Sequence, residues 1–108
     1  MVYQLQPLEK EAEIKDLIIA QQNLARQALS EYSVLAENII VSKTTDHNRI
    51  EHTLDGMLDF CFDADMLLLF KKLCRYYFTI NPQATAFYIN HYREMWDSDS
   101  IDNKELAI

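Results

Sequence analysis

Glycine and proline are scarce in this chain, and their scarcity limits what it can fold into. The 108 residues include one glycine, Gly56, and two prolines, Pro7 and Pro82. A β-sandwich or barrel needs many tight turns, which glycine and proline most often form. The length suits one domain with a modest core. We therefore predict an all-α protein, a compact bundle of four helices, or five if the first helix breaks.

A long N-terminal helix is predicted from residue 8 to about residue 41. Apolar or small residues recur there at alternating steps of four and three, with one polar exception: Ile14, Ile18, Gln21, Ala25, Ala28, Tyr32, Leu35 and Ile39. This spacing is typical of a heptad-like helical stripe. Leu17, Leu24 and Ala36 widen the stripe, so it predicts a broad buried face rather than a narrow two-stranded seam.

The length of this helix raises a packing question. An unbroken helix would be roughly 50 Å long at 1.5 Å per residue, far longer than any later helix. Either it bends at Ser30, or the surplus length pairs with a second copy of the chain. If the surplus length pairs with a second copy, polar substitutions at Ile18 and Ile39 would dissociate the dimer.

Capping signals delimit the three later helices. A polar connection over residues 42–48 offers Thr44, Thr45 and Asp46 as N-caps for a second helix. Asp63 or Asp65 would cap a third helix, which ends near residue 80 and is apolar on nearly two faces, so we expect it at the centre. The pair Asn81-Pro82 begins a fourth helix that runs to about residue 97.

One domain is expected over residues 1–97, followed by an acidic, frayed tail over residues 98–108. Cys61 and Cys74 lie in apolar stretches and are expected to be buried, reduced thiols. Gly56 falls within the second helix at a cost of about 1 kcal/mol relative to alanine. We interpret it as a tolerated weakness rather than as a site of close helix approach.

Acidic residues form a ladder at strict four-residue spacing, with no Lys or Arg between Arg49 and Lys71. We call these residues the acidic ladder: Glu51, Asp55, Asp59 and Asp63. On one helix face, like charges repel by a few tenths of a kcal/mol per pair. One explanation is internal, with Lys71, Lys72 and Arg75 of the third helix neutralising the ladder at about 0 to 1 kcal/mol per exposed pair. The other is functional, with the ladder facing a basic partner.

Aromatic residues repeat along the fourth helix. Tyr88, Tyr92 and Trp96 recur every four residues, and Phe87 and Met95 point in neighbouring directions. Tyrosine and tryptophan are favoured interface anchors because they bury a large area and keep a polar group. We expect Phe87 and Met95 in the core, and the other three as an exposed surface for a partner.

Composition and motifs argue against several functions. A formal charge of −7 disfavours attraction to DNA, RNA or anionic lipid. Although His47, Glu51, His52 and Asp55 are close in sequence, no Glu is followed by His three residues later, as helical di-iron sites require, so no metal or cofactor is expected. Without a phosphate-binding loop, a Gly-x-Ser-x-Gly or a paired-cysteine motif, the chain is predicted not to be an enzyme.

Residues 1–10 lack the pattern of a secretory signal, and no apolar run is long enough to cross a bilayer. We therefore expect a cytoplasmic protein that does not enter the membrane.

These features favour a small acidic protein–protein interaction module, such as a regulator, inhibitor, antitoxin or adaptor. It would bind a basic surface of a partner protein, in one version by imitating nucleic-acid phosphates. The candidate partner-binding residues are Glu51, Asp55, Asp59, Asp63, Tyr88, Tyr92 and Trp96. Two alternatives stay open: a self-associating structural protein, for example a homodimer, and a helical regulator that binds nucleic acid.

Overall fold

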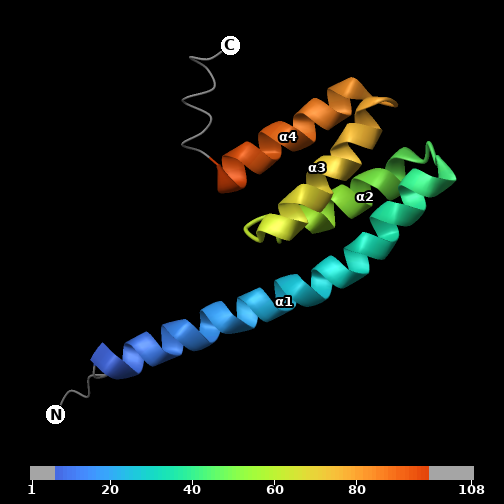
Figure 1. Cartoon of the computed structure of the whole chain (residues 1–108). Coiled ribbons are helices and arrows are strands. Elements are labelled where there is room, and N and C mark those ends of the chain that lie inside the picture. Colours follow the sequence, from blue (N-terminus) through green and yellow to red (C-terminus); the bar gives the residue numbers. More distant parts are fainter. Residues whose placement is uncertain (1–6, 98–108) are drawn as a thin grey trace.

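Four helices follow one another along residues 7–97, the part of the chain that the computed structural model describes (Figure 1). They are α1 (Pro7–Ser42), α2 (His47–Leu58), α3 (Ala64–Phe78) and α4 (Pro82–Trp96). No strand is present within this range. The predicted all-α bundle with a long first helix is therefore confirmed, and the predicted tail over residues 98–108 lies outside the described residues.

The first helix is continuous. α1 passes through Ser30 without interruption, so the fifth helix that a break there would have created does not form in residues 7–97. α1 ends where Lys43 adopts a left-handed conformation with φ 55°. The Lys43 N–H donates to Ile40 O (3.2 Å) and the Thr44 N–H donates to Ile39 O (3.4 Å). This is the Schellman pattern, which usually carries glycine at that point; a lysine costs about 1 kcal/mol there.

Each later helix begins at a side-chain cap. Asp46, Asp63 and Asn81 each accept a hydrogen bond from the backbone N–H three residues further on, at 3.3, 3.0 and 3.0 Å respectively. The structure thus selects Asp46 from three candidates and Asp63 from two, and it confirms Asn81. Losing such a cap typically costs about 1 kcal/mol. Local chemistry in the sequence therefore set all three starting points.

The core forms around α3, which packs against each of the other three helices, as expected from its two apolar faces. The buried residues that contact one another in the core are Ala28, Ala36, Ile39, Ile50, Leu54, Met57, Leu58, Cys61, Met66, Phe70, Leu73, Cys74, Tyr77 and Tyr88. The first contributor from α1 is Ala28, which lies past the middle of that helix. The earlier turns of α1 therefore take no part in this core.

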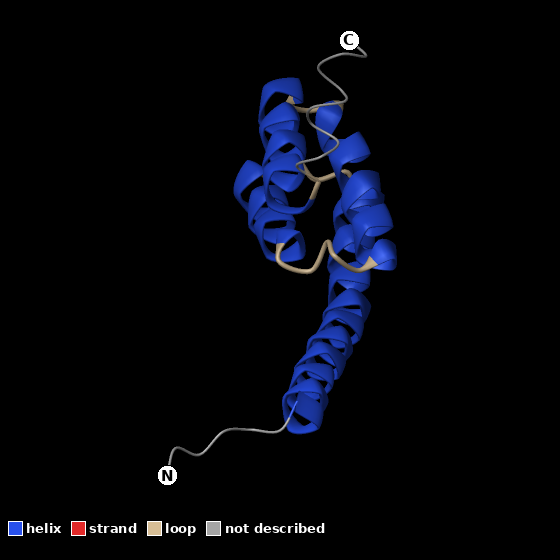
Figure 2. Cartoon of the chain, turned by 90° about the vertical axis from the view of Figure 1, so that its left-hand side faces the viewer, coloured by secondary structure: helices blue, strands red, loops and turns tan. Residues whose placement is uncertain are grey.

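The two halves of α1 have different surroundings. The packed half, Ala25–Ser42, lies against the bundle and buries Ala25, Ala28, Ala36 and Ile39. The free half, Glu11–Leu24, is exposed at every position. Figure 2 shows this part of the helix extending alone beyond the other three helices. The surplus length predicted from the sequence is therefore real, and the bundle does not cover it.

Gly56 marks a close approach between α2 and α1. A Cβ atom at Gly56 would lie 2.0 Å from the hydroxyl oxygen of Tyr32 and 2.7 Å from Cζ of the same ring. Both distances are too short for non-bonded atoms, so the ring occupies the space that a side chain would need. The interpretation of Gly56 as a tolerated weakness was wrong, because the glycine admits a neighbouring side chain.

Candidate interaction surfaces

The acidic ladder does not lie along one helix. α2 ends at Leu58, Asp59 is its C-cap, and Asp63 is the N-cap of α3. Only Glu51 and Asp55 belong to the body of α2. The expectation of four carboxylates on a single helical face was therefore wrong. A turn after Leu58 interrupts the four-residue repeat, and the repulsion that the repeat implied is reduced accordingly.

Glu51 is used inside the fold. Its carboxylate accepts a hydrogen bond from the hydroxyl of Tyr77 on α3, whose side chain is fully buried. Nδ1 of His47 lies 3.0 Å from the same hydroxyl, and it must be the donor there because the hydroxyl hydrogen goes to Glu51. Burial, and then the bond to Glu51, raise the pKa of Tyr77, so the hydroxyl stays protonated. Glu51 thus joins α2 to α3.

Asp55 and Asp59 are exposed, and they are the part of the ladder that remains open to solvent. Asp55 lies near Tyr88 of α4. Burial of Tyr88 raises its pKa, and the nearby Asp55 carboxylate raises it further. The Tyr88 hydroxyl itself donates to the backbone carbonyl of Glu51 at 3.4 Å. The surface that sequence reasoning assigned to four carboxylates is therefore reduced to two.

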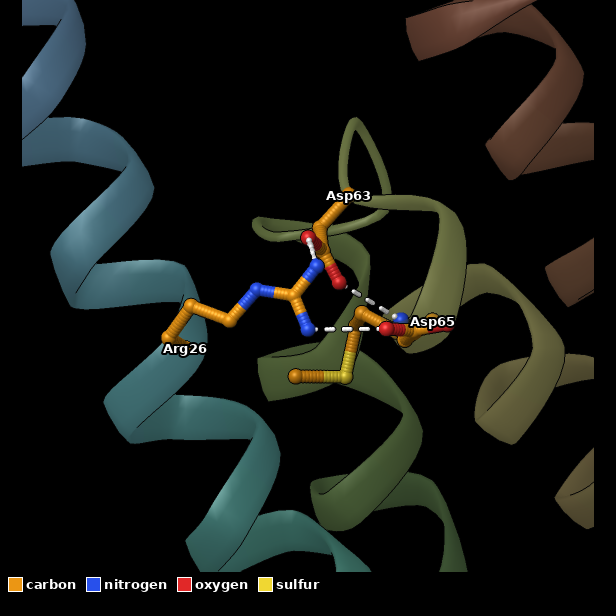
Figure 3. Close-up of polar contacts among 4 residues, drawn as sticks. Arg26, Asp63 and Asp65 are labelled. Carbon is orange, nitrogen blue, oxygen red and sulfur yellow. Dashed lines mark hydrogen bonds and ion pairs between the residues drawn. The ribbon is translucent and has the colours of Figure 1, made fainter.

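Asp63 is held by Arg26 of α1 (Figure 3). The Arg26 guanidinium lies 2.9 Å from Asp63 Oδ1 and 2.7 Å from Asp65 Oδ2. Only 12% of the Asp63 side chain is exposed. The hydrogen bond to Asp65 and the charge of Asp63 together raise the pKa of Arg26. We call these two ion pairs of one guanidinium the Arg26 fork. The fork joins α1 to the start of α3 at the boundary between the packed half and the free half.

The predicted neutralisation of the ladder by Lys71, Lys72 and Arg75 was wrong. Lys72 pairs with Glu37 of α1 at 3.2 Å. Across residues 11–97, no ion pair joins any of these three cations to the ladder. Arg26, which lies more than twenty residues before the ladder, pairs instead with one ladder residue, Asp63. Sequence spacing alone could not indicate that α1 would reach this turn.

Burial along α4 reverses the prediction for Tyr88, Phe87 and Met95, whereas Trp96 is exposed as predicted, at 39%. Tyr88 is only 5% exposed, whereas Phe87 is 62% exposed and Met95 is 41% exposed. Tyr92 is half-buried, and Trp96 donates from Nε1 to the carbonyl of Leu58 at 2.7 Å. α4 therefore turns its tyrosines toward α2 and α3: the Tyr88 hydroxyl donates to the carbonyl of Glu51, and the Tyr92 ring lies near Phe70. Phe87 is left outside.

A groove runs between α3 and α4, with a cavity volume of about 410 Å³. We call it the α3–α4 groove. Its apolar lining comes from both helices: Leu67, Phe70, Cys74, Phe78, Ile89 and Tyr92. Three cations, Lys71, Arg75 and Arg93, and one carboxylate, Asp97, also line it. On a chain with a formal charge of −7, this groove is a local site with an excess of positive charge.

The two cysteines are buried, as predicted, and free. Burial raises the pKa of each thiol to about 12, so both are neutral thiols at pH 7. The Cys61 thiol also donates to Met57 O at 3.3 Å. Neither thiol has the lowered pKa of a reactive cysteine. Within residues 11–97, no group of three His, Cys, Asp or Glu side chains is arranged to hold a metal ion.

The free half of α1 carries the largest set of exposed aliphatic side chains on one element. Leu17 is 70% exposed, and Ile18 is 48% exposed. The other exposed aliphatic residues on this segment are Ile14, Ile19 and Leu24. On the helix, Ile14, Leu17, Ile18 and Leu24 lie on the same side as the buried Ala25, Ala28 and Ile39. The face that packs in the bundle therefore continues beyond it.

Comparison with known protein families, curated proteins and solved structures gives no matching family model, curated protein or structure. Among the helices of residues 7–97, none combines the length and apolarity needed to cross a membrane. Partner binding by the seven candidate residues stays a prediction.

Sequence reasoning missed the α3–α4 groove, because its cations and its apolar residues were assigned to separate roles. The pair Lys71 and Arg75, one helical turn apart on α3, was the sequence feature that could have indicated a basic groove.

Proposed function

We propose that this protein is a non-enzymatic interaction module that self-associates through the free half of α1. The supporting observation is that an apolar heptad stripe, continuous with the buried face of the same helix, is exposed over Glu11–Leu24. Self-association was an alternative in the sequence analysis. The structure favours it over binding through the acidic ladder, because Glu51 and Asp63 already have partners within the chain.

The energetics of the free half also favour a partner. A helix of this length without tertiary contacts is marginally stable in water, since most helical stability in proteins comes from packing an amphipathic face. Fully burying a leucine or isoleucine side chain contributes about 1.5 to 3 kcal/mol. Ile14, Leu17, Ile18 and Leu24 are about half to two-thirds exposed, so each would gain roughly 1 kcal/mol when covered. A second copy of the same chain can supply the apolar surface that covers them.

The main test is solution mass as a function of concentration, by analytical ultracentrifugation. We expect the wild type to form a multiple of 12.7 kDa. Ile18→Asp should shift the protein to monomer, because it places a charge in the stripe. Ile19→Asp is the matched control: Ile19 is similarly exposed, at 53%, but lies off the stripe. A wild type that stays monomeric at all concentrations would overturn the proposal.

Hydrogen exchange gives a second test. In the monomeric Ile18→Asp variant, amide protection should be high in the packed half and low in the free half. In the associated wild type, protection should extend into Glu11–Leu24, because association stabilises its helical hydrogen bonds. Equal protection of the free half in the two proteins would contradict a role for this segment in assembly.

A partner with a basic surface, bound through Asp55 and Asp59, remains a second candidate, because both carboxylates are exposed. Replacing both by asparagine would abolish that binding while leaving helicity intact. The same variant should leave self-association unchanged, so the two functions can be tested separately.

A further inference from the structure

We propose that the free half of α1 from one copy docks into the α3–α4 groove of a second copy. The inference rests on the proposed self-association and names the surface that receives the helix. Each chain carries an exposed amphipathic helix and a groove with apolar lining. Docking an amphipathic helix into such a groove is a common mode of recognition.

The lengths agree. The groove lining runs along α3 from Leu67 to Phe78, which is about 16 Å at the helical rise of 1.5 Å per residue. The stripe of the free half runs from Ile14 to Leu24, about 15 Å on the same basis. The cavity of about 410 Å³ is within the range of about 300 to 1,000 Å³ for sites that enclose ligand groups. Several aliphatic side chains can therefore enter together.

The width of the stripe also favours a groove over a seam. In the heptad of α1, Ile14 and Ile18 occupy seam positions, whereas Leu17 and Leu24 flank the seam on one side. A two-stranded coiled coil buries the seam and leaves flanking positions at its edge. A groove between two helices contacts a helix on two sides, so it can cover the flanking leucines as well. The weak seam residue Gln21 further disfavours pairing of two free halves.

The charges are complementary. Lys71, Arg75 and Arg93 against Asp97 leave the groove lining with an excess of two positive charges. The free half carries three acids, Glu11, Glu13 and Asp16, and one base, Lys15, an excess of two negative charges. On the helix, Glu11 and Glu13 flank the apolar stripe on opposite sides. Complementary rim charges of this kind increase the association rate and fix the register.

An interface between unlike surfaces has a consequence for assembly. The free half and the groove are different patches, so two copies either exchange helices reciprocally in a closed dimer or join head to tail. In both cases, a copy with a damaged helix still has an intact groove, and a copy with a damaged groove still has an intact helix. If two free halves paired with each other instead, a copy with a damaged helix would keep no intact binding surface, because one damaged helix removes the interface.

Mixing two variants tests the proposal. The helix variant carries Leu17→Asp and Ile18→Asp; the groove variant carries Lys71→Glu and Arg75→Glu, at two exposed positions. Each alone should have a dissociation constant for self-association raised on the order of tenfold or more. Mixed in equal amounts, they should form a heterodimer through one intact interface. Lys72→Glu, on the same helix but outside the groove lining, is the control and should self-associate like the wild type.

Charge reversal in trans sharpens the assignment. A chain with Glu11→Lys and Glu13→Lys should bind the groove variant more tightly than the wild-type free half does.

If the groove variant self-associates like the wild type, the groove is not the receiving surface, although self-association through α1 still stands. If the wild type itself is monomeric, both proposals fail. Absence of a heterodimer in the mixture favours pairing of two free halves and overturns the groove.

Discussion

The two halves of α1 carry the same heptad repeat in different surroundings. In the packed half, Ile39 is fully buried; in the free half, Ile18, three heptads earlier at the equivalent position, is 48% exposed. The helical repeat determines which face of α1 is apolar in both halves. It does not determine where the other helices stop, and the bundle extends only as far as the turn after α2. Arg26 marks that limit, since its ion pairs join α1 to this turn.

The comparison also revises how the dimer should be tested. Ile18 and Ile39 are equivalent positions in the heptad, and from the sequence a polar substitution at both was expected to dissociate a dimer. Because Ile39 lies in the core of the monomer, a polar substitution there would unfold the bundle. Only Ile18 reports on association, and this distinction requires the tertiary structure.

The largest expected effect is the contrast between these two isoleucines. Ile39→Ala should lower the free energy of unfolding by about 2 to 5 kcal/mol, because it opens a cavity in the core. Ile18→Ala, measured at a concentration where the chain is monomeric, should change it by less than about 0.5 kcal/mol. Urea denaturation followed by circular dichroism measures both. Similar losses at the two positions would show that the free half is packed within the monomer.

The second effect is loss of bundle stability in alkali. Burial raises the pKa of Cys61 and Cys74 to about 12. In the unfolded chain these thiols ionise near their ordinary value, so above about pH 9 the unfolded state loses protons that the folded state keeps. The free energy of unfolding should then fall by up to about 1.4 kcal/mol per pH unit for each thiol.

Urea denaturation at a series of pH values from 7 to 11 would measure this slope. The Cys61→Ala/Cys74→Ala variant is the control and should show a smaller slope, with the remainder starting above about pH 10 from tyrosines such as Tyr77, whose pKa is also raised. A free energy of unfolding that is constant up to pH 11 would contradict the burial of these groups. The free half holds no cysteine or tyrosine, so this effect belongs to the bundle alone.

A smaller effect is expected at the contact between Gly56 and Tyr32. Alanine would improve the helical propensity of α2 by about 1 kcal/mol, but its Cβ would displace the Tyr32 ring at a cost of about 1 to 3 kcal/mol. We expect Gly56→Ala to be destabilising by about 1 kcal/mol in the wild type. In a Tyr32→Ala background the same substitution should be stabilising. An unchanged sign in the two backgrounds would rule out the steric explanation.

The smallest effect is expected at the boundary between the two halves. Arg26→Ala removes the fork to Asp63 and Asp65, and because the arginine is exposed, we expect only a small decrease in the urea midpoint. The decrease should shrink as salt is added, since exposed ion pairs are screened. Arg26→Lys should recover part of it, because a lysine keeps the charge but not the fork. A loss that is independent of salt would assign Arg26 a packing role.

Sequence reasoning succeeded for features that depend on neighbouring residues. Asp46, Asp63 and Asn81 cap helices because each side chain reaches the backbone three residues further on, and such contacts need no tertiary structure. It was less successful for features that depend on which helices meet. The ladder was placed on one helix because the turn after Leu58 carries no glycine or proline, and Phe87 was placed in the core because apolarity does not tell which side of a helix is covered.

The sequence by itself therefore determined the helices, their starting points and the apolar faces, because these follow from local hydrogen bonding and from a repeat of 3.6 residues. Only the tertiary structure decided that Arg26 holds Asp63, that Tyr77 binds Glu51, and that Lys71 and Arg75 line a groove with Arg93. These pairings join residues far apart in the chain. Their partners depend on how the helices pack around α3, and packing also left half of α1 outside the bundle.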